Sequence, residues 1–323
     1  MLIIAVVAIV LIGVGKVFFS GPLPVLQVAP ETVFHVADGV NLTNTLFATW
    51  VTLIVLLLLF RSASTNMKMV PTGVQALMEF VVEWFLGLVE SIAGKRYARS
   101  FFPLIATVFF FVLANAWLGL LPGYGTIGIV HHAHGEQQPV PFTSIGPISV
   151  IMPGTVALPA ETHAEHGEVI GVLTPFLRAA NTDLNTPLAL AIITFIFVEW
   201  WGIKVNGAGY FKKFFNFSGV VPAFVGGLEL VSELVRLVSF TFRLFGNMFA
   251  GEVLLAVMVF LVPWVLVVPF YGLEIFVGLV QAVVFAALNL VFVTMAVAGH
   301  GDGHAEEHAE QSAHPVAHGA AEH

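Results

Sequence analysis

Two long apolar stretches near the end of the chain, 228–262 and 265–298, contain ionisable side chains that are costly to place in a membrane. In the first stretch, seven polar or charged residues recur at steps of three and four. They are Glu229, Ser232, Glu233, Arg236, Ser239, Arg243 and Asn247. On a helix that turns about 100° per residue, they form one polar stripe. Charges in such positions are typical of functional sites or of buried ion pairs.

Arg243 lies near the middle of this stretch, too deep for its side chain to reach the membrane surface easily. Its guanidinium stays charged at any usable pH, so it requires an anion. The nearest carboxylate on its own stripe is Glu233, ten residues away. We therefore expect the partner of Arg243 to come from another chain, and the alternative is a structural ion pair inside the helix bundle.

Three more polar residues are expected near one end of the last two stretches. Glu252 lies nine residues beyond Arg243, which places it about 180° around the helix. Glu274 and Gln281 are seven residues apart on the final stretch and share a face. Pro263 interrupts the chain between the two stretches and predicts an antiparallel pair of helices. Glu252 and Glu274 should then approach the same, outer end of that pair.

Composition and motifs argue against several classes of protein. The 323 residues are 58% apolar and only 10% charged, which favours a polytopic membrane protein over soluble domains. A net charge of −8 argues against nucleic-acid binding. There is no cysteine for a disulfide or thiolate site and no phosphate-binding loop. The histidines of 131–166 lack a metal-ligand spacing, so no metal or cofactor is predicted.

The apolar runs predict an all-α membrane protein with five to six membrane-embedded helices. The runs are 42–60, 101–121, 184–203, 228–262 and 265–298, with 1–19 as a borderline sixth. A further helix at 74–93 is amphipathic, because Glu79, Glu83 and Glu90 share one face, and it should lie on the membrane surface or pack on other helices there. The last two helices should form a long, tilted, antiparallel pair.

Lysine and arginine set the orientation. Basic clusters at 61–99 and 204–213 place those segments in the cytoplasm. Residues 122–183 contain a single lysine or arginine, Arg178, and should lie outside, with an irregular loop over 122–168. The predicted parts are an N-terminal apolar and outer segment at 1–41, a membrane domain at 42–298 and a His-rich cytoplasmic tail at 299–323. Residues 1–19 are either a retained helix or a removed leader.

The segment "RLVSFTFRLFGNMFAGEVLL", residues 236–255, resembles the signature of subunit a of the F-type ATP synthase. Three other segments agree with that family: "PTGVQALMEFVVEW", "LANAWLGLLPG" and "NTDLNTPLALA". The resemblance covers roughly 42–298. It implies a stator subunit of the membrane sector, in a bacterial inner membrane, that works with a c-subunit ring, the b subunits of the peripheral stalk and the remaining synthase subunits. By this resemblance, the subunit has no catalytic site of its own, and it forms two offset half-channels for protons.

By the same resemblance, Arg243 is the essential arginine that faces the c-ring carboxylates. The resemblance assigns the outer half-channel to Asn247, Glu252, Glu274, Gln281, Asp183 and Asn185. It assigns Glu229 and Ser232 to the inner half-channel, with Glu233 at the inner mouth. Many family members pair a glutamate with a histidine where this chain has Glu252 and Glu274, so these two acids could share a proton. Leu237 replaces a proline found in many members.

Two other functions are compatible with a polar membrane bundle. A free-standing secondary transporter would use Arg243 to bind an anionic substrate, and would typically show internal repeats, which the sequence does not show. An intramembrane metalloprotease would need ligands inside the spans, yet the five clear runs contain no histidine.

Overall fold

The structure is a computed structural model of the chain. It describes residues 29–37, 40–65, 67–131, 140–145, 148–150, 169–214, 219–261 and 267–298. The predictions for 1–19, for the tail at 299–323 and for the chain break at Pro263 lie outside the described residues.

Five helices in the described part are long and apolar enough to cross a membrane. They are α2 (Asn44–Ser64), α3 (Val74–Gly119), α4 (Asn185–Asn206), α5 (Val220–Leu261) and α6 (Val267–Ala298). Each covers one of the predicted apolar runs, so the predicted helical membrane fold is confirmed. The backbone of such segments satisfies its own polar groups, as a lipid environment requires.

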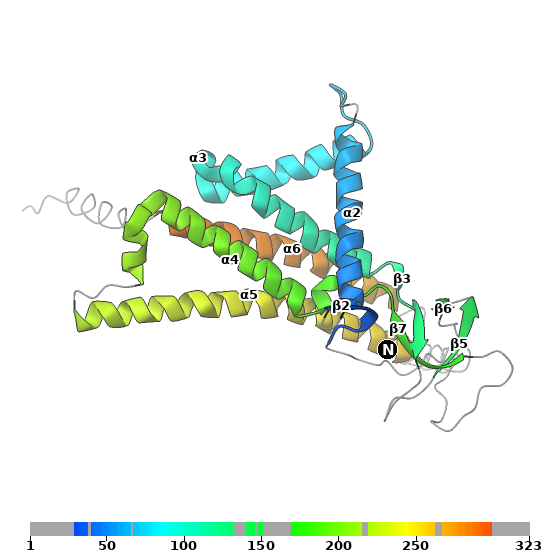
Figure 1. Cartoon of the computed structure of the whole chain (residues 1–323). Coiled ribbons are helices and arrows are strands. Elements are labelled where there is room, and N and C mark those ends of the chain that lie inside the picture. The colour runs from blue at the N-terminus through cyan, green and yellow to red at the C-terminus, as the bar shows by residue number, and fades with distance from the viewer. Residues whose placement is uncertain are drawn as a thin grey trace, which may run out of the picture.

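Helix α3 joins two elements that the sequence predicts separately, the amphipathic helix and the second membrane run. Gly94 interrupts it with φ 68° and ψ 158°, a conformation that residues with a side chain rarely adopt. The two arms therefore fold back at this residue, as the cyan and teal segments in Figure 1 show. A single glycine thus joins the two arms without an intervening loop.

The prediction of an irregular loop over 122–168 is wrong for its described residues, which form short strands. The strands are β3 (Pro122–Gly125), β4 (Ile127–His131), β5 (Val140–Ile145), β6 (Ile148–Val150) and, just beyond, β7 (Val169–Pro175). Strands β4, β6, β5 and β7 pair antiparallel around a small closed sheet. Isoleucine, valine and threonine are frequent here and favour strands. The many glycines and prolines between them favour turns and hide this strand preference in the sequence. A second hairpin, β1 (Thr32–Ala37) with β2 (Val40–Thr43), precedes α2.

The core lies between α3 and α6, with α4 packed against both α5 and α6. Its largest fully buried side chains are aromatic, as Phe85, Phe101, Phe109 and Phe285 show. Helix α2 packs on α3 but buries only 11% of its most apolar window. Its exposed leucines and isoleucine suit a surface in contact with lipid.

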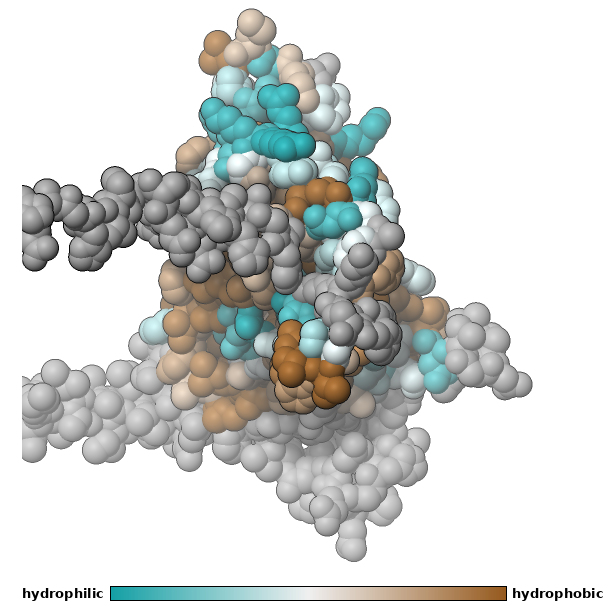
Figure 2. All heavy atoms as spheres, turned by 90° about the vertical axis from the view of Figure 1, so that its left-hand side faces the viewer, coloured by the Kyte–Doolittle hydropathy of each residue, from teal (hydrophilic) through white to brown (hydrophobic). Residues whose placement is uncertain are grey.

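The bundle has two ends that matter for the site (Figure 1). At the strand end, α2, α4 and α6 begin, α3 and α5 end, and the short helix η1 (Ala180–Thr182) contacts α2, α3, α4 and α5. At the opposite, distal end, α4 continues into η2 (Gly207–Lys213) and α5 begins. Seen from the distal side, hydrophilic residues gather over the upper part of the face and apolar residues cover much of the described surface below (Figure 2).

Candidate functional site

The polar stripe of α5 follows the border between its packed and its exposed faces. The packed face includes Phe240, Leu244 and Met248, each at most 5% exposed. The other face presents large apolar side chains to the surroundings: Leu228, Val231, Leu234, Val235, Val238 and Phe242, each at least 50% exposed. A broad apolar face next to a row of charges is typical of a surface that meets lipid or another membrane helix.

Arg243 lies half-buried on this border, near the middle of α5. Its Nη2 donates to Ser239 Oγ at 3.4 Å, and its guanidinium carbon lies 5.7 Å from the centre of the Phe240 ring. Within the described part of the chain, no carboxylate forms an ion pair with it. The cation therefore stands at an open surface with only weak local contacts.

An open pocket of about 370 Å³ lies beside Arg243. Its polar lining comes from Ser232, Arg236, Ser239 and Arg243, and its apolar lining includes Phe292 of α6. Four residues of the predicted stripe thus line one pocket. Its two guanidinium groups favour the binding of a negatively charged group.

At the strand end, Glu252 forms an ion pair with Arg178, a residue of the segment between β7 and η1. The Arg178 Nη2 donates to Glu252 Oε2 at 3.1 Å and its Nε donates to Glu252 Oε1 at 3.2 Å. Arg178 is only 7% exposed, whereas the Glu252 side chain is 39% exposed. This two-pronged geometry is the strong form of a carboxylate–guanidinium pair.

The segment before α2 contacts this ion pair through Arg178. Arg178 Nη1 donates to the Ala29 carbonyl at 3.5 Å, and Glu31 Oε2 accepts from Asn44 Nδ2 at 3.2 Å. Burial raises the pKa of the Glu31 carboxyl to about 7, with Arg178 lowering it and Glu252 raising it. Glu31 therefore belongs electrostatically to the Arg178–Glu252 pair.

Asp183 is held at the same end by the first turn of α2. Its Oδ2 accepts from Thr45 Oγ1 at 3.1 Å, and its Oδ1 accepts from the Asn185 backbone N–H and side-chain amide, each at 3.1 Å. The structure thus brings Asp183 and Asn185 together. Asn247 is exposed on α5 and Gln281 is half-buried on α6, and within the described residues no hydrogen bond joins either to this network.

Glu274 approaches the end of α5, as the predicted antiparallel pair requires. It is 8% exposed, and its carboxylate lies where a side-chain carbon on Gly251 would be. Gly251 directly precedes Glu252, so the two acids lie at the same end of the helix pair. In the described part of the chain no hydrogen bond joins them, because Glu252 turns to Arg178 instead.

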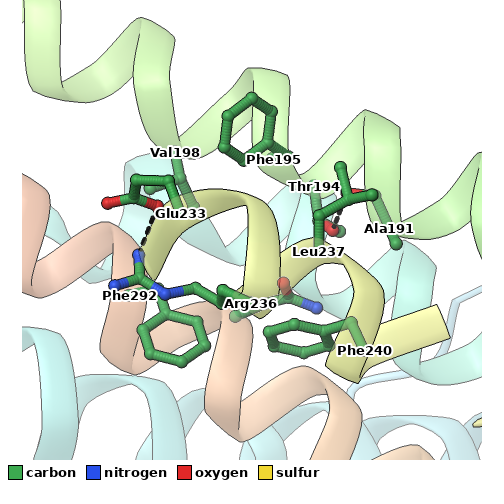
Figure 3. Close-up of a pocket in the computed structure, with 10 residues that line it drawn as sticks. Ala191, Thr194, Phe195, Val198, Glu233, Arg236, Leu237, Phe240 and Phe292 are labelled. Atoms are coloured by element: carbon green, nitrogen blue, oxygen red, sulfur yellow. Dashed lines mark hydrogen bonds and ion pairs between the residues drawn. The ribbon is translucent and has the colours of Figure 1, made fainter. Parts of the chain in front are cut away.

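Toward the distal end, Glu233 and Arg236 form an ion pair on α5, with Nη1 and Oε2 2.7 Å apart. Glu233 is 2% exposed, and the Arg236 guanidinium carbon lies 4.1 Å from the centre of the Phe292 ring. Figure 3 shows both charges over a cavity of about 20 Å³ that Thr194 of α4 and Asn289 of α6 also line. A cavity of this size holds about one water molecule. Of the other residues predicted here, Glu229 is half-buried and Ser232 is exposed.

Tyr210 of η2 belongs electrostatically to the same cluster. Burial raises the pKa of its phenol, and the carboxylates of Glu199 and Glu233 raise it further. Residues of α4, η2 and α5 therefore interact electrostatically in this cluster. Glu199 was not singled out in the sequence, although it is an acid inside a predicted span and that signal could have marked it.

Sequence reasoning also missed Arg178 and Glu31 as site residues. In the sequence, Arg178 indicates only an outward-facing loop, and Glu31 lies before the first predicted membrane run. The one available signal was that Arg178 is the sole base between 122 and 183, close to predicted acids.

Comparisons with known proteins agree with this architecture. The sequence model of the ATP synthase A chain family matches residues 46–294. A protein named ATP synthase subunit a from Moorella thermoacetica is 28% identical over 85% of this chain and 99% of its own length. One of the same name from Gloeobacter violaceus is 30% identical over 80% of this chain and 85% of its own length. The match includes α3, α4 and α5 with its whole polar stripe and nearly all of α2 and α6, and the chain therefore belongs to the ATP synthase A chain family.

Proposed function

We propose that this chain is the stator subunit of the membrane sector of a rotary ATP synthase, and that Arg243 faces the carboxylates of a c-subunit ring. One observation carries the proposal. Arg243 lies halfway along α5, at the edge of an exposed apolar face, with no carboxylate partner in the described part of the chain. A cation held there stabilises the ionised form of an acid that arrives from a neighbouring helix.

The two polar clusters serve as the ends of two half-channels. On an α-helix, Glu233 lies about 15 Å from Arg243 along the axis and Glu252 about 13.5 Å on the other side. A proton entering at the strand end neutralises a c-ring carboxylate, which can then turn into lipid. After the rotation, the carboxylate meets Arg243 and releases its proton toward the distal cluster. The fixed charge of Arg243 blocks direct passage between the channels, and each charge that crosses 100 mV contributes about 2.3 kcal/mol.

In this proposal the strand end faces the outside of a bacterial inner membrane and the distal end faces the cytoplasm. The basic residues support that orientation, because Arg61 and Lys204 lie in the last turns of α2 and α4, and Lys95 directly follows the fold-back of α3 at Gly94. The exposed apolar face of α5 meets the c-ring. The b subunits of the peripheral stalk hold the chain against rotation.

The test is Arg243→Ala in the complete synthase complex. We expect the complex to assemble and to lose ATP synthesis driven by a proton gradient. Arg61→Ala is the matched control, because Arg61 is an exposed cation at the end of α2. Gradient-driven synthesis at the wild-type rate in the Arg243→Ala complex would refute the proposal, and so would substrate transport by the purified chain alone.

A further inference from the structure

The segment before the first membrane helix supplies an acid to the strand-end cluster. Glu31 is fixed there twice: its carbonyl accepts from the Asn44 backbone N–H at 3.1 Å and its carboxylate accepts from the Asn44 side chain at 3.2 Å. Two residues earlier, the Ala29 carbonyl accepts from Arg178. Asn44 thus fixes Glu31 at the first turn of α2, and the Ala29 contact ties the same segment to the Arg178–Glu252 pair.

The charges of this cluster do not balance. Arg178 provides one positive charge, while Glu31 and Glu252 provide two acids that feel each other and the guanidinium. Asp183 is engaged separately by Thr45 and Asn185. A half-buried site with one cation and two acids favours the state in which one of the two acids carries a proton.

We propose that Glu31 is the outermost proton-exchanging residue of the strand-end path and passes its proton to Glu252, with Arg178 pairing whichever of the two carboxylates is ionised. In the forward step, the O–H bond of the Glu31 carboxyl breaks and an O–H bond forms on Glu252. Glu31 is left as a carboxylate beside Arg178, and it regains a proton from outer water. The net charge of the cluster is the same before and after the transfer.

Two features favour this role over a purely structural one. A glutamate that only anchored the hairpin would gain most as a permanent carboxylate, yet burial raises the pKa of Glu31 to about 7. The acid therefore exchanges its proton near neutral pH, where a proton donor in a relay is most effective. In addition, the Glu252 side chain is 39% exposed, and its partner Arg178 also contacts the Ala29 carbonyl two residues before Glu31.

This inference rests on the proposed function, and the experiment separates the two. The complete synthase is reconstituted in liposomes with the strand end facing the lumen, and the membrane potential is held constant. Gradient-driven ATP synthesis is measured at lumenal pH values from about 5.5 to 8.5, which bracket the pH at which a carboxyl with a pKa near 7 exchanges its proton. The readout is the rate of the Glu31→Gln complex divided by the wild-type rate at each pH.

We expect this ratio to fall to about one tenth near neutral pH, a smaller loss than the hundredfold or more that a positioned acid can contribute where water has no access. The ratio should return toward one at the acidic limit, where protons reach Glu252 directly through water. The matched control is Glu83→Gln, an exposed acid on the first arm of α3, for which the ratio stays at one.

A ratio of one at every pH overturns the inference, and so does a uniform loss that does not depend on pH. If Glu31→Gln prevents assembly, Glu31→Asp replaces it, and a pH profile identical to that of the wild type overturns the inference. Arg243→Ala in the same liposomes tests the proposed function separately. If Arg243→Ala abolishes synthesis while Glu31→Gln behaves as the wild type, only the role of Glu31 fails.

Discussion

At the scale of single residues, the site depends on which charges find partners inside the chain and which do not. Glu252 pairs with Arg178, and Glu233 pairs with Arg236. Arg243 contacts a serine hydroxyl and an aromatic ring instead. Leaving a cation without an anion inside a membrane costs several kcal/mol, and under the proposed function a c-ring carboxylate offsets that cost.

The close approach of Glu274 to Gly251 gives a prediction at this scale. In Gly251→Ala, the added methyl group meets the Glu274 carboxylate, so α5 and α6 must separate or Glu274 must move. Overpacking of this kind costs about 1–3 kcal/mol. We expect a large loss of gradient-driven proton flux in vesicles that contain the assembled complex.

The control for this variant is Gly272→Ala on α6, because a methyl group there meets nothing within 4 Å. It should leave the flux unchanged. Equal flux in the two variants would show that the Gly251–Glu274 contact does not matter for the path.

At the scale of elements, the helices were largely predictable and the contacts between them were not. Hydropathy located every described membrane helix, and periodicity predicted the stripe that holds Arg243. Periodicity, however, places residues only on their own helix. Arg178 lies 74 residues before Glu252, and no local pattern predicts that pairing.

The strands of the loop were missed for a different reason. Their residues are interspersed with glycine, proline and histidine, which favour turns, and strand formation there depends on pairing between segments that are distant in sequence. Gly94 was missed as well, because its positive φ follows from how the two arms of α3 pack.

The contact between α3 and α6 gives a prediction at this scale. Gly278 of α6 lies against Ala116 of α3, and a side-chain carbon added at Gly278 would come within 2.8 Å of the Ala116 methyl group. We expect Gly278→Val to lower the free energy of unfolding by about 1–3 kcal/mol, because backbone of two packed helices must move apart. Thermal denaturation of the complex in detergent measures this change.

Gly87→Val is the control, since nothing lies within 4 Å of a side-chain carbon at Gly87 and both glycines are in helices. Both variants change helix propensity by the same amount, so only the contact differs. A midpoint for Gly278→Val equal to that of Gly87→Val would contradict the tight packing of these helices.

At the scale of the whole molecule, α5 is too long to cross a membrane upright. Its 42 residues span about 63 Å, roughly twice the ~30 Å hydrocarbon core. In Figure 1, α5 runs at a steep angle to α2, so an upright α2 leaves α5 strongly inclined. Under the proposed function, this inclination separates the two polar clusters laterally as well as in depth, as two offset paths to a curved ring require.

Docking of the segment that contains Glu31 onto the strand end should depend on pH, which gives a prediction for the whole molecule. Docked, Glu31 has a pKa of about 7, while the undocked carboxyl has its ordinary value of 4.5. Between these values the docked form binds more protons than the undocked form, so docking weakens as pH rises from 4.5 to 7 and changes little above that range. Solvent screening reduces the effect to about 1 kcal/mol or slightly more.

Hydrogen exchange at the Asn44 amide reports this docking directly, because its N–H donates to the Glu31 carbonyl. After correction for intrinsic exchange, we expect protection of this amide in the wild type to fall by about tenfold between pH 5 and pH 7.5, the equivalent of about 1.4 kcal/mol. In Glu31→Gln the side chain has no proton to lose, so the protection should not change with pH. The same pH dependence in the two proteins would show that Glu31 is not the group that couples docking to pH.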